Sequence, residues 1–169
     1  MSGYRFDRLK FLIVDDSAHM RKLVITILQA FDVSQVIEAP NAEKAWALLR
    51  EVEPDVVILD WVMEGMSGID LVKMIRTHPQ SANPFVPVIM LSGHTHIDKV
   101  QEARDAGINE FLAKPVSVNA MMTRLVSVIE NPRPFVRTSC YFGPCRRRHD
   151  GEVYQGPERR ADPASQAAE

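Results

Sequence analysis

The sequence predicts an α/β domain with a doubly wound parallel sheet, followed by a C-terminal tail. Two observations support this prediction: short apolar runs alternate with segments of helical periodicity, and the runs are nearly continuous and rich in β-branched residues. Such runs indicate strands that are buried on both faces, as in parallel sheets. Right-handed crossovers would then place the helices on both faces of the sheet. The expected strands cover residues 11–14, 33–37, 56–59, 86–91 and 111–112.

Five segments between and after these strands have the periodicity of amphipathic helices. In the first, apolar residues recur at positions 20, 23, 24, 27, 28 and 31, which lie on one helical face. The other helices are expected around 42–49, 69–75, 97–103 and 121–129. Asn41 and Ser117 are the expected N-caps of the second and fifth helices. Gly107 is expected to end the fourth helix.

The composition is that of a soluble globular protein and excludes several classes. Hydrophobic residues make up 46% of the 169 residues and charged residues 25%. With 20 basic and 22 acidic side chains, the net charge of −2 argues against a nucleic-acid or polybasic membrane protein. No apolar run approaches the roughly 20 residues of a membrane span. Two cysteines cannot form a disulfide framework, so we expect a cytoplasmic protein with reduced thiols.

A domain boundary is predicted near residue 130, where both charge and composition change. Residues 1–130 contain 13 basic and 17 acidic side chains (net −4), whereas residues 131–169 contain 7 and 5 (net +2). The second segment is rich in proline and arginine and has no apolar period. We therefore expect one folded domain at 1–130 and a mostly disordered tail at 131–169. A tail of this size and polarity is too small for a DNA-binding winged helix.

The tail contains an internal repeat of the form Tyr-x-Gly-Pro-x-Arg-Arg. Its two copies cover residues 141–147 and 154–160. A solvated flexible extension and a short motif for an anionic or protein partner both remain open, since paired arginines suit phosphate or carboxylate. Cys140, Cys145 and His149 match no common zinc spacing and lack a fourth ligand, so a zinc site is disfavoured.

Reactive polar residues follow four of the five expected strands. Asp15 and Asp16 follow the first strand, Asp60 the third, Ser92 the fourth, and Lys114 lies just after the fifth. In a doubly wound fold, chemistry occurs beyond the carboxyl ends of the strands. Each residue alone is commonly a turn or cap residue. Their joint placement predicts a functional site.

Three converging carboxylates need a cation. Two unit charges about 4 Å apart repel by about 4 kcal/mol at an effective dielectric constant near 20. Mg²⁺ resolves this repulsion because it accepts carboxylates together with water and phosphate oxygens. Lys114 would add a second positive centre and Ser92 a hydroxyl donor. This combination suits phosphoryl transfer with Asp60 as the nucleophile.

At these residues the sequence resembles the receiver domains of bacterial two-component response regulators, and most closely those of the single-domain chemotaxis type. The matching stretches, which follow the family's order within residues 10–130, are FLIVDDSAHMRKLV, DVVILDWVMEGMSGIDLVKMIR, VPVIMLSGH and AGINEFLAKPV. The resemblance implies a five-stranded sheet of order 2-1-3-4-5. It also implies a cis peptide bond between Lys114 and Pro115.

The resemblance further implies the role of each site residue. Asp60 would accept a phosphoryl group from a sensor histidine kinase or a histidine phosphotransfer protein. The other site residues would fall into two groups, one that holds Mg²⁺ together with Asp60 and one that binds and senses the phosphoryl group. The metal ligands would be Asp15, Asp16, Asp60 and the carbonyl of Val62; Lys114 would pair with the phosphoryl oxygens, and Ser92 and Phe111 would form the switch.

A regulator of this kind is not an enzyme in the usual sense, because its own chemistry is limited to gaining and losing the phosphoryl group. Its output would be contact with an unknown protein partner. Val62, Glu64, Gly93 and His94 depart from the residues that are common in the family around the site. These departures concern the lifetime of the aspartyl phosphate and leave phosphorylation itself intact.

Two other functions use similar residues. A Mg²⁺-dependent phosphohydrolase with an aspartyl nucleophile also places Asp, Ser or Thr, and Lys at strand ends, but it carries Asp-x-Asp at the nucleophile, and this chain has adjacent aspartates instead. Turnover of small phosphate esters would distinguish it. A nucleotide-binding domain would need a G-x-G-x-x-G motif or a P-loop, and the sequence contains neither.

Overall fold

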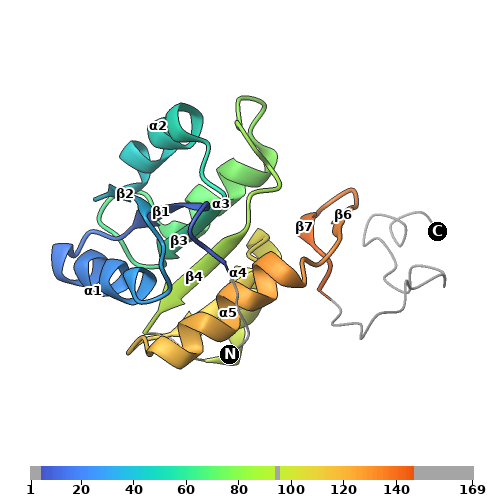
Figure 1. The fold of residues 1–169 in the computed structure, drawn as a ribbon. Coiled ribbons are helices and arrows are strands. Elements are labelled where there is room, and N and C mark those ends of the chain that lie inside the picture. Colours follow the sequence, from blue (N-terminus) through green and yellow to red (C-terminus); the bar gives the residue numbers. More distant parts are fainter. Residues whose placement is uncertain (1–4, 94–95, 147–169) are drawn as a thin grey trace, which may run out of the picture.

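A computed structural model describes residues 5–93 and 96–146 of the chain. Its centre is a parallel sheet of five strands in the order β2-β1-β3-β4-β5, as the sequence analysis expected (Figure 1). The register is continuous, with Val14 opposite both Ala39 and Leu59 and with Asp60 opposite Leu91. The strands are β1 (Lys10–Val14), β2 (Gln35–Ala39), β3 (Val56–Asp60), β4 (Val88–Ser92) and β5 (Glu110–Ala113).

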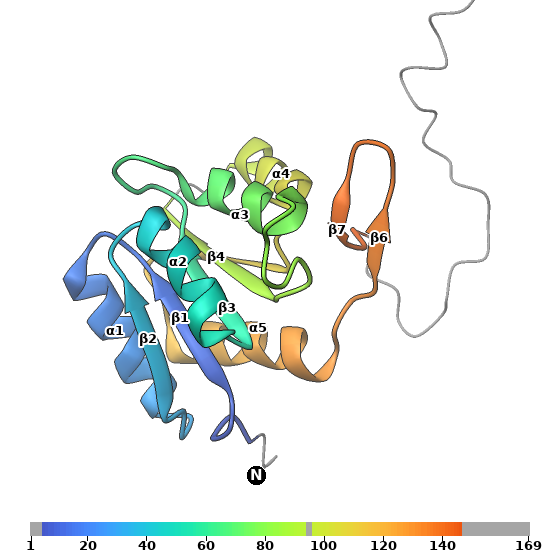
Figure 2. The same ribbon diagram turned by 90° about the horizontal axis from the view of Figure 1, so that it is seen from above.

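Five helices cover the two faces of the sheet. Figures 1 and 2 show α1 and α5 on one face and α2, α3 and α4 on the other. This arrangement follows from right-handed crossovers between neighbouring parallel strands. The helices are α1 (Ala18–Gln29), α2 (Ala42–Val52), α3 (Gly68–Thr77), α4 (Ile97–Ala106) and α5 (Val118–Glu130).

The core has two layers because successive strand residues point to opposite faces of the sheet. Leu12 and Leu59 belong to the layer beneath α2, α3 and α4, whereas Ile13 and Ile58 belong to the layer beneath α1 and α5. All four side chains are buried, which explains why the strands read as continuous apolar runs.

The predicted caps are confirmed, and the strand limits move by one or two residues. Asn41 accepts a hydrogen bond from the Lys44 amide, Ser117 accepts one from the Ala120 amide, and Gly107 ends α4 in the left-handed region with φ of 104°. Strand β2 begins at Gln35 rather than at residue 33. The difference arises in the preceding turn, where Asp32 has φ of 62° and the amide of Val33 donates to the carbonyl of Leu28.

The structure differs from the expected flexible tail at residues 135–144. Strands β6 (Phe135–Arg137) and β7 (Phe142–Pro144) pair antiparallel beyond the end of α5 (Figures 1 and 2). The physical reason is a cluster of three aromatic rings, in which Phe85 lies 5.2 Å from Phe135 and 5.3 Å from Phe142, centroid to centroid. We call residues 131–146 the C-terminal hairpin.

The rest of the tail lies largely outside the described residues. The second copy of the repeat, at residues 154–160, and His149 both fall there, so the expectations for them stay predictions. Cys140 and Cys145 are free thiols. None of the helices in the described part of the chain is long and apolar enough to cross a membrane.

Candidate functional site

Three carboxylates meet at the carboxyl edge of the sheet, as the strand-end pattern predicted. Strands β1 and β3 are neighbours, so Asp15 and Asp16 after β1 lie beside Asp60 at the end of β3. One oxygen of each carboxylate lies within 4.8 Å of the others. Asp15 and Asp60 are buried, whereas Asp16 is exposed. The cluster is therefore open to solvent on the Asp16 side.

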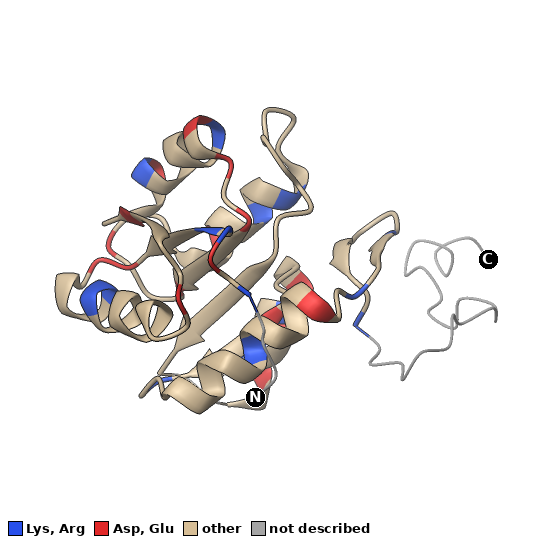
Figure 3. Ribbon diagram, viewed as in Figure 1, with Lys and Arg blue, Asp and Glu red and all other residues tan. Residues whose placement is uncertain are grey.

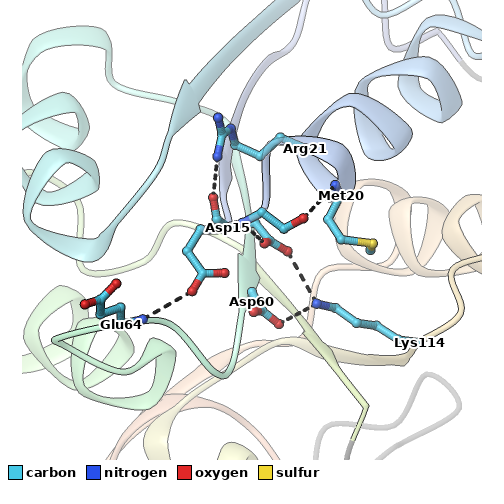
Figure 4. A network of polar contacts seen from close by, with 8 residues as sticks. Asp15, Met20, Arg21, Asp60, Glu64 and Lys114 are labelled. Carbon is cyan, nitrogen blue, oxygen red and sulfur yellow. Dashed lines mark hydrogen bonds and ion pairs between the residues drawn. The ribbon is translucent and has the colours of Figure 1, made fainter.

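Lys114 brings a positive charge to this cluster from the end of β5. Its Nζ lies 2.8 Å from Asp60 Oδ1 and 3.4 Å from Asp15 Oδ2 (Figure 4). Its backbone amide donates to the Ser92 carbonyl at 2.8 Å, which ties the end of β5 to the end of β4. The peptide bond that follows, Lys114–Pro115, is cis, as expected. One ammonium group thus bridges two of the three carboxylates.

The pKa values of Asp60 and Lys114 both lie above their ordinary values. Burial raises the pKa of Asp60, the hydrogen bond from Lys114 opposes this, and the charges of Asp15 and Asp16 add to the increase. For Lys114, burial lowers the pKa, but Asp60 and Asp15 together outweigh it, so its pKa is raised. Lys114 is therefore a cation at neutral pH, and it faces carboxylates whose combined negative charge exceeds its own.

Three contacts that the sequence analysis missed position the aspartates (Figure 4). The Ser17 amide donates to Asp15 Oδ1 at 2.8 Å, and the Glu64 amide donates to Asp16 Oδ2 at 3.3 Å. Arg21 donates from Nη1 to the backbone carbonyl of Asp15 at 2.8 Å. Ser17 has a signal in the sequence because its residue type favours the N-cap of α1, a position that it occupies. Glu64 lies 48 residues from Asp16, and Arg21 is an ordinary polar residue in the first turn of α1.

Arg21 also has an acidic partner on β2. Its Nε lies 2.8 Å from Glu38 Oε2, and the guanidinium is largely covered while Glu38 is about half exposed. The second strand was the one expected strand with no reactive polar residue after it, and it supplies Glu38, the residue that orients Arg21. Arg21 itself lies on the side of Asp15 away from Lys114 (Figure 4).

The predicted switch residues lie on the two neighbouring strands. Ser92 ends β4 and is buried, next to Ala113 in the register. Phe111 of β5 lies opposite Met90 of β4. It is half-buried and packs against the core layer under α2, α3 and α4. Val62 follows Asp60 by two residues, and its side chain is exposed. All predicted site residues therefore lie at or near one edge of the sheet.

The donor set fits a hard divalent cation. Carboxylate oxygens are the protein ligands that Mg²⁺ prefers, and it retains water and phosphate oxygens as the remaining ligands. Asp15, Asp16 and Asp60 could hold such an ion, since their oxygens converge and Lys114 balances only part of their charge. Among the described residues, this is the group of acidic side chains with the spacing of a metal site.

Comparisons with known proteins agree with this geometry. Residues 11–126 match the family described as the response regulator receiver domain. The chain is 33% identical over 122 residues to the chemotaxis protein CheY-3 of Vibrio cholerae, covering 72% of this chain and 92% of that protein. It is 30% identical to the chemotaxis protein CheY of Pseudomonas aeruginosa, covering 72% and 97%.

Solved structures give the same result. The chemotaxis protein CheY4 of Vibrio cholerae superimposes with a TM-score of 0.66 at 33% identity, covering 72% of this chain and 98% of that one. A putative response regulator of Chloroflexus aurantiacus superimposes with a TM-score of 0.67 at 27% identity, covering 73% and 98%. The match over most of the domain, with the carboxylates and the lysine at one edge, shows that this chain belongs to the response regulator receiver domain family.

Proposed function

We propose that this protein is a phospho-accepting switch of a two-component system, and that Asp60 receives the phosphoryl group from a sensor histidine kinase or a histidine phosphotransfer protein. The observation that carries the proposal is the grouping of three carboxylates with Lys114, whose Nζ lies 2.8 Å from Asp60. Membership of a family of signalling regulators supports it. The proposal makes this chain a regulator and not an enzyme that turns over a substrate.

In the transfer, a carboxylate oxygen of Asp60 forms a bond to phosphorus while the bond to the donor imidazole nitrogen breaks. The imidazole then takes a proton from solvent. Lys114 stabilises the charge on the phosphoryl oxygens, exchanging its present contact with Asp60 for one with them. Bound Mg²⁺, held by Asp15, Asp16, Asp60 and the carbonyl of Val62, would supply further neutralisation of the transferred charge.

The burial of Asp60 supports its role as acceptor. The residue is 5% exposed, so its carboxylate is shielded by the protein except towards the open Asp16 side from which a phosphoryl group could approach. Ser92, one strand away and buried, is suited to donate its hydroxyl proton to a phosphoryl oxygen. In donating this proton, Ser92 would move toward the phosphoryl group. Phe111 on the next strand would respond by burying its ring, and it could respond in no other way because it lacks the hydroxyl group of a tyrosine. The output would then be contact with a protein partner.

The test is phosphorylation with a small donor and with purified kinases. Acetyl phosphate and Mg²⁺ should label the wild type, and Asp60→Asn should reduce labelling to background. Asp32→Asn is the matched control, because Asp32 is an exposed aspartate in the turn before β2 and should label like the wild type. EDTA should abolish labelling. Labelling of Asp60→Asn at the wild-type rate would overturn the assignment.

The same protein sample tests the phosphohydrolase alternative. A regulator should be labelled once per molecule and should release phosphate slowly, whereas a hydrolase should turn over small phosphate esters many times. Hydrolysis of p-nitrophenyl phosphate that depends on Asp60 would favour the hydrolase. Transfer from one kinase in a panel, with no ester turnover, would support the switch.

A further inference from the structure

The C-terminal hairpin is attached to the end of α4 and to the turn that follows it. Arg146 Nη1 lies 2.8 Å from Asp105 Oδ1 in the last turn of α4. Arg133 donates from its guanidinium to the backbone carbonyl of Asn109, just before β5. Residues 131–146 carry three arginines and no acidic side chain, so the hairpin is basic and one of its arginines pairs with the aspartate at the end of α4 (Figure 3).

The backbones of the hairpin and of the α4–β5 turn are in close contact. A Cβ atom on Gly143 would lie 2.9 Å from the Cα atom of Gly107 and 2.5 Å from the hydroxyl oxygen of Tyr141. No real Cβ atom tolerates such distances, so any side chain at position 143 would push the hairpin away from the turn. Tyr141 itself donates to the Pro144 carbonyl at 2.8 Å.

A buried arginine joins the hairpin to the core on its other side. Arg76 of α3 is 3% exposed, and its Nε donates to the Gly107 carbonyl at 2.9 Å. Its guanidinium also lies 5.0 Å from the ring centroid of Phe135 in β6. The turn after α4 is therefore held between Arg76 and the hairpin.

Helix α4 has few other attachments to the domain. Only Ala103 and Ala106 of its ten residues are buried, and both are small. Ile97 in its first turn is 76% exposed. His96 occupies the N-cap position without a hydrogen bond from its side chain. Helix α4 packs against α3 but buries little apolar surface. Elements with few buried apolar contacts open at low free energy, so an added ion pair at the last turn of α4 should slow its opening.

The other end of α4 faces the phosphoacceptor. Lys99 Nζ lies 5.6 Å from the ring centroid of Trp61, the residue directly after Asp60. The chain also enters this helix shortly after Ser92 and Gly93, at the end of β4. One short helix thus contacts the phosphorylation site at its first turn and the C-terminal hairpin at its last turn.

We propose that the C-terminal hairpin is an inhibitory clamp that couples to the phosphoacceptor site through α4. This inference rests on the proposed function of Asp60. The hairpin contacts are present together with the ion pair of Lys114 and Asp60, and the proposed transfer requires Lys114 to exchange that pair for contacts with the phosphoryl oxygens. A segment that stabilises one of two states opposes any ligand that favours the other, and this coupling is reciprocal.

Two consequences follow for the full-length chain. Loosening the hairpin should increase the affinity of the site for a phosphoryl group, and phosphorylation should loosen the hairpin. A partner that binds the arginine-rich tail and draws the hairpin off α4 would then sensitise the regulator to its kinase. The first copy of the repeat would act as the clamp, since Tyr141, Gly143 and Arg146 all belong to it.

The experiment uses three full-length variants. Arg146→Ala removes the ion pair with Asp105, and Gly143→Ala places a methyl group against Gly107. Arg5→Ala is the matched control, because it removes an exposed ion pair with Asp7 near the other end of the chain. Hydrogen exchange of the α4 amides reports whether the clamp has opened. Calorimetric titration with beryllofluoride and Mg²⁺ reports the affinity of the site.

Both clamp variants should show at least threefold faster exchange in α4 and at least threefold tighter beryllofluoride binding, with Arg5→Ala equal to the wild type. Faster exchange with unchanged or weaker binding would overturn the coupling. Unchanged exchange in Arg146→Ala would overturn the clamp itself, even where Gly143→Ala fails to fold. A wild-type protein that binds no beryllofluoride would overturn the proposed function, while the exchange data would still decide whether the hairpin holds α4.

Discussion

Lys114 and Asp60 form an ion pair of 2.8 Å at the edge of the sheet, although they come from strands that are not neighbours. Strand β4 lies between β3 and β5, so the long lysine side chain reaches across the end of β4 to the carboxylate. The same Nζ lies 3.4 Å from Asp15 Oδ2. A single cation therefore balances two buried carboxylates, and a third, Asp16, stands beside them.

Asp60→Asn should stabilise the metal-free protein at neutral pH by about 1–2 kcal/mol, which is the screened part of the repulsion among close carboxylates. The sign follows from the raised pKa of Asp60: the ionised form is less favourable in the folded state than in the unfolded state. The stability gained by Asp60→Asn should therefore shrink as pH falls through the raised pKa of the folded protein towards 3.8, the ordinary pKa of this carboxyl group in the unfolded chain. Urea unfolding in EDTA from pH 7 to pH 3.5 measures it. A gain that stays constant over this range would contradict the prediction.

Lys114→Met should destabilise the metal-free protein by about 2 kcal/mol, because it leaves Asp15 and Asp60 without their counter-charge. Saturating Mg²⁺ should narrow the difference from the wild type, since an ion that binds the folded state stabilises it. Lys73→Met, on the exposed face of α3, is the control and should change little. Melting curves with EDTA and with Mg²⁺ decide the matter. An equal loss under both conditions would mean that the carboxylates do not bind the ion.

Gly68→Ala should destabilise the domain by about 1–3 kcal/mol and slow the phosphorylation of Asp60. A Cβ atom at this position would lie 2.2 Å from the backbone oxygen of Asp60, so the start of α3 or the phosphoacceptor must move. Gly93→Ala is the matched substitution for stability, because a Cβ atom there meets nothing within 4 Å. Chemical denaturation of both variants tests this difference. Equal stability of the two would show that α3 can shift freely.

Arg76→Met should cost about 3 kcal/mol of stability. The guanidinium donates to the carbonyls of Gly107, Pro84 and Val86 and to Asn109 Oδ1, and a thioether leaves these buried acceptors unpaired. Burial lowers the pKa of Arg76 to about 10, so the residue still carries its charge at pH 7.

The control for Arg76 is Arg50→Met, which removes an exposed arginine whose hydrogen bonds within the described residues go to Gln80 and whose guanidinium lies over the Trp46 ring. It should change stability by no more than about 0.5 kcal/mol. Urea denaturation of both variants gives the comparison. A loss of less than about 1 kcal/mol in Arg76→Met would mean that the core relaxes around the missing donors.

Much of the fold could be predicted because its signals are local. A run such as residues 56–59 indicates a buried strand by composition, and caps such as Asn41 and Ser117 act within a few residues of their own positions. The convergence of Asp15, Asp60 and Lys114 followed from one topological rule, that the carboxyl ends of parallel strands meet at one edge. The sequence by itself thus determined the strands of the sheet and the edge at which these polar residues meet, whereas the strand order followed from the resemblance to receiver domains.

Only the tertiary structure decided the C-terminal hairpin and the environment of Arg76. Phe85, Phe135 and Phe142 have no common period, so nothing in the sequence marks them as one cluster. Arg76 lies in an ordinary helical stripe, and its acceptors are spread over two other segments of the chain. Contacts of this kind join residues that are distant in sequence. Their free energy depends on geometry that the rest of the fold must first create, and local patterns therefore cannot reveal them.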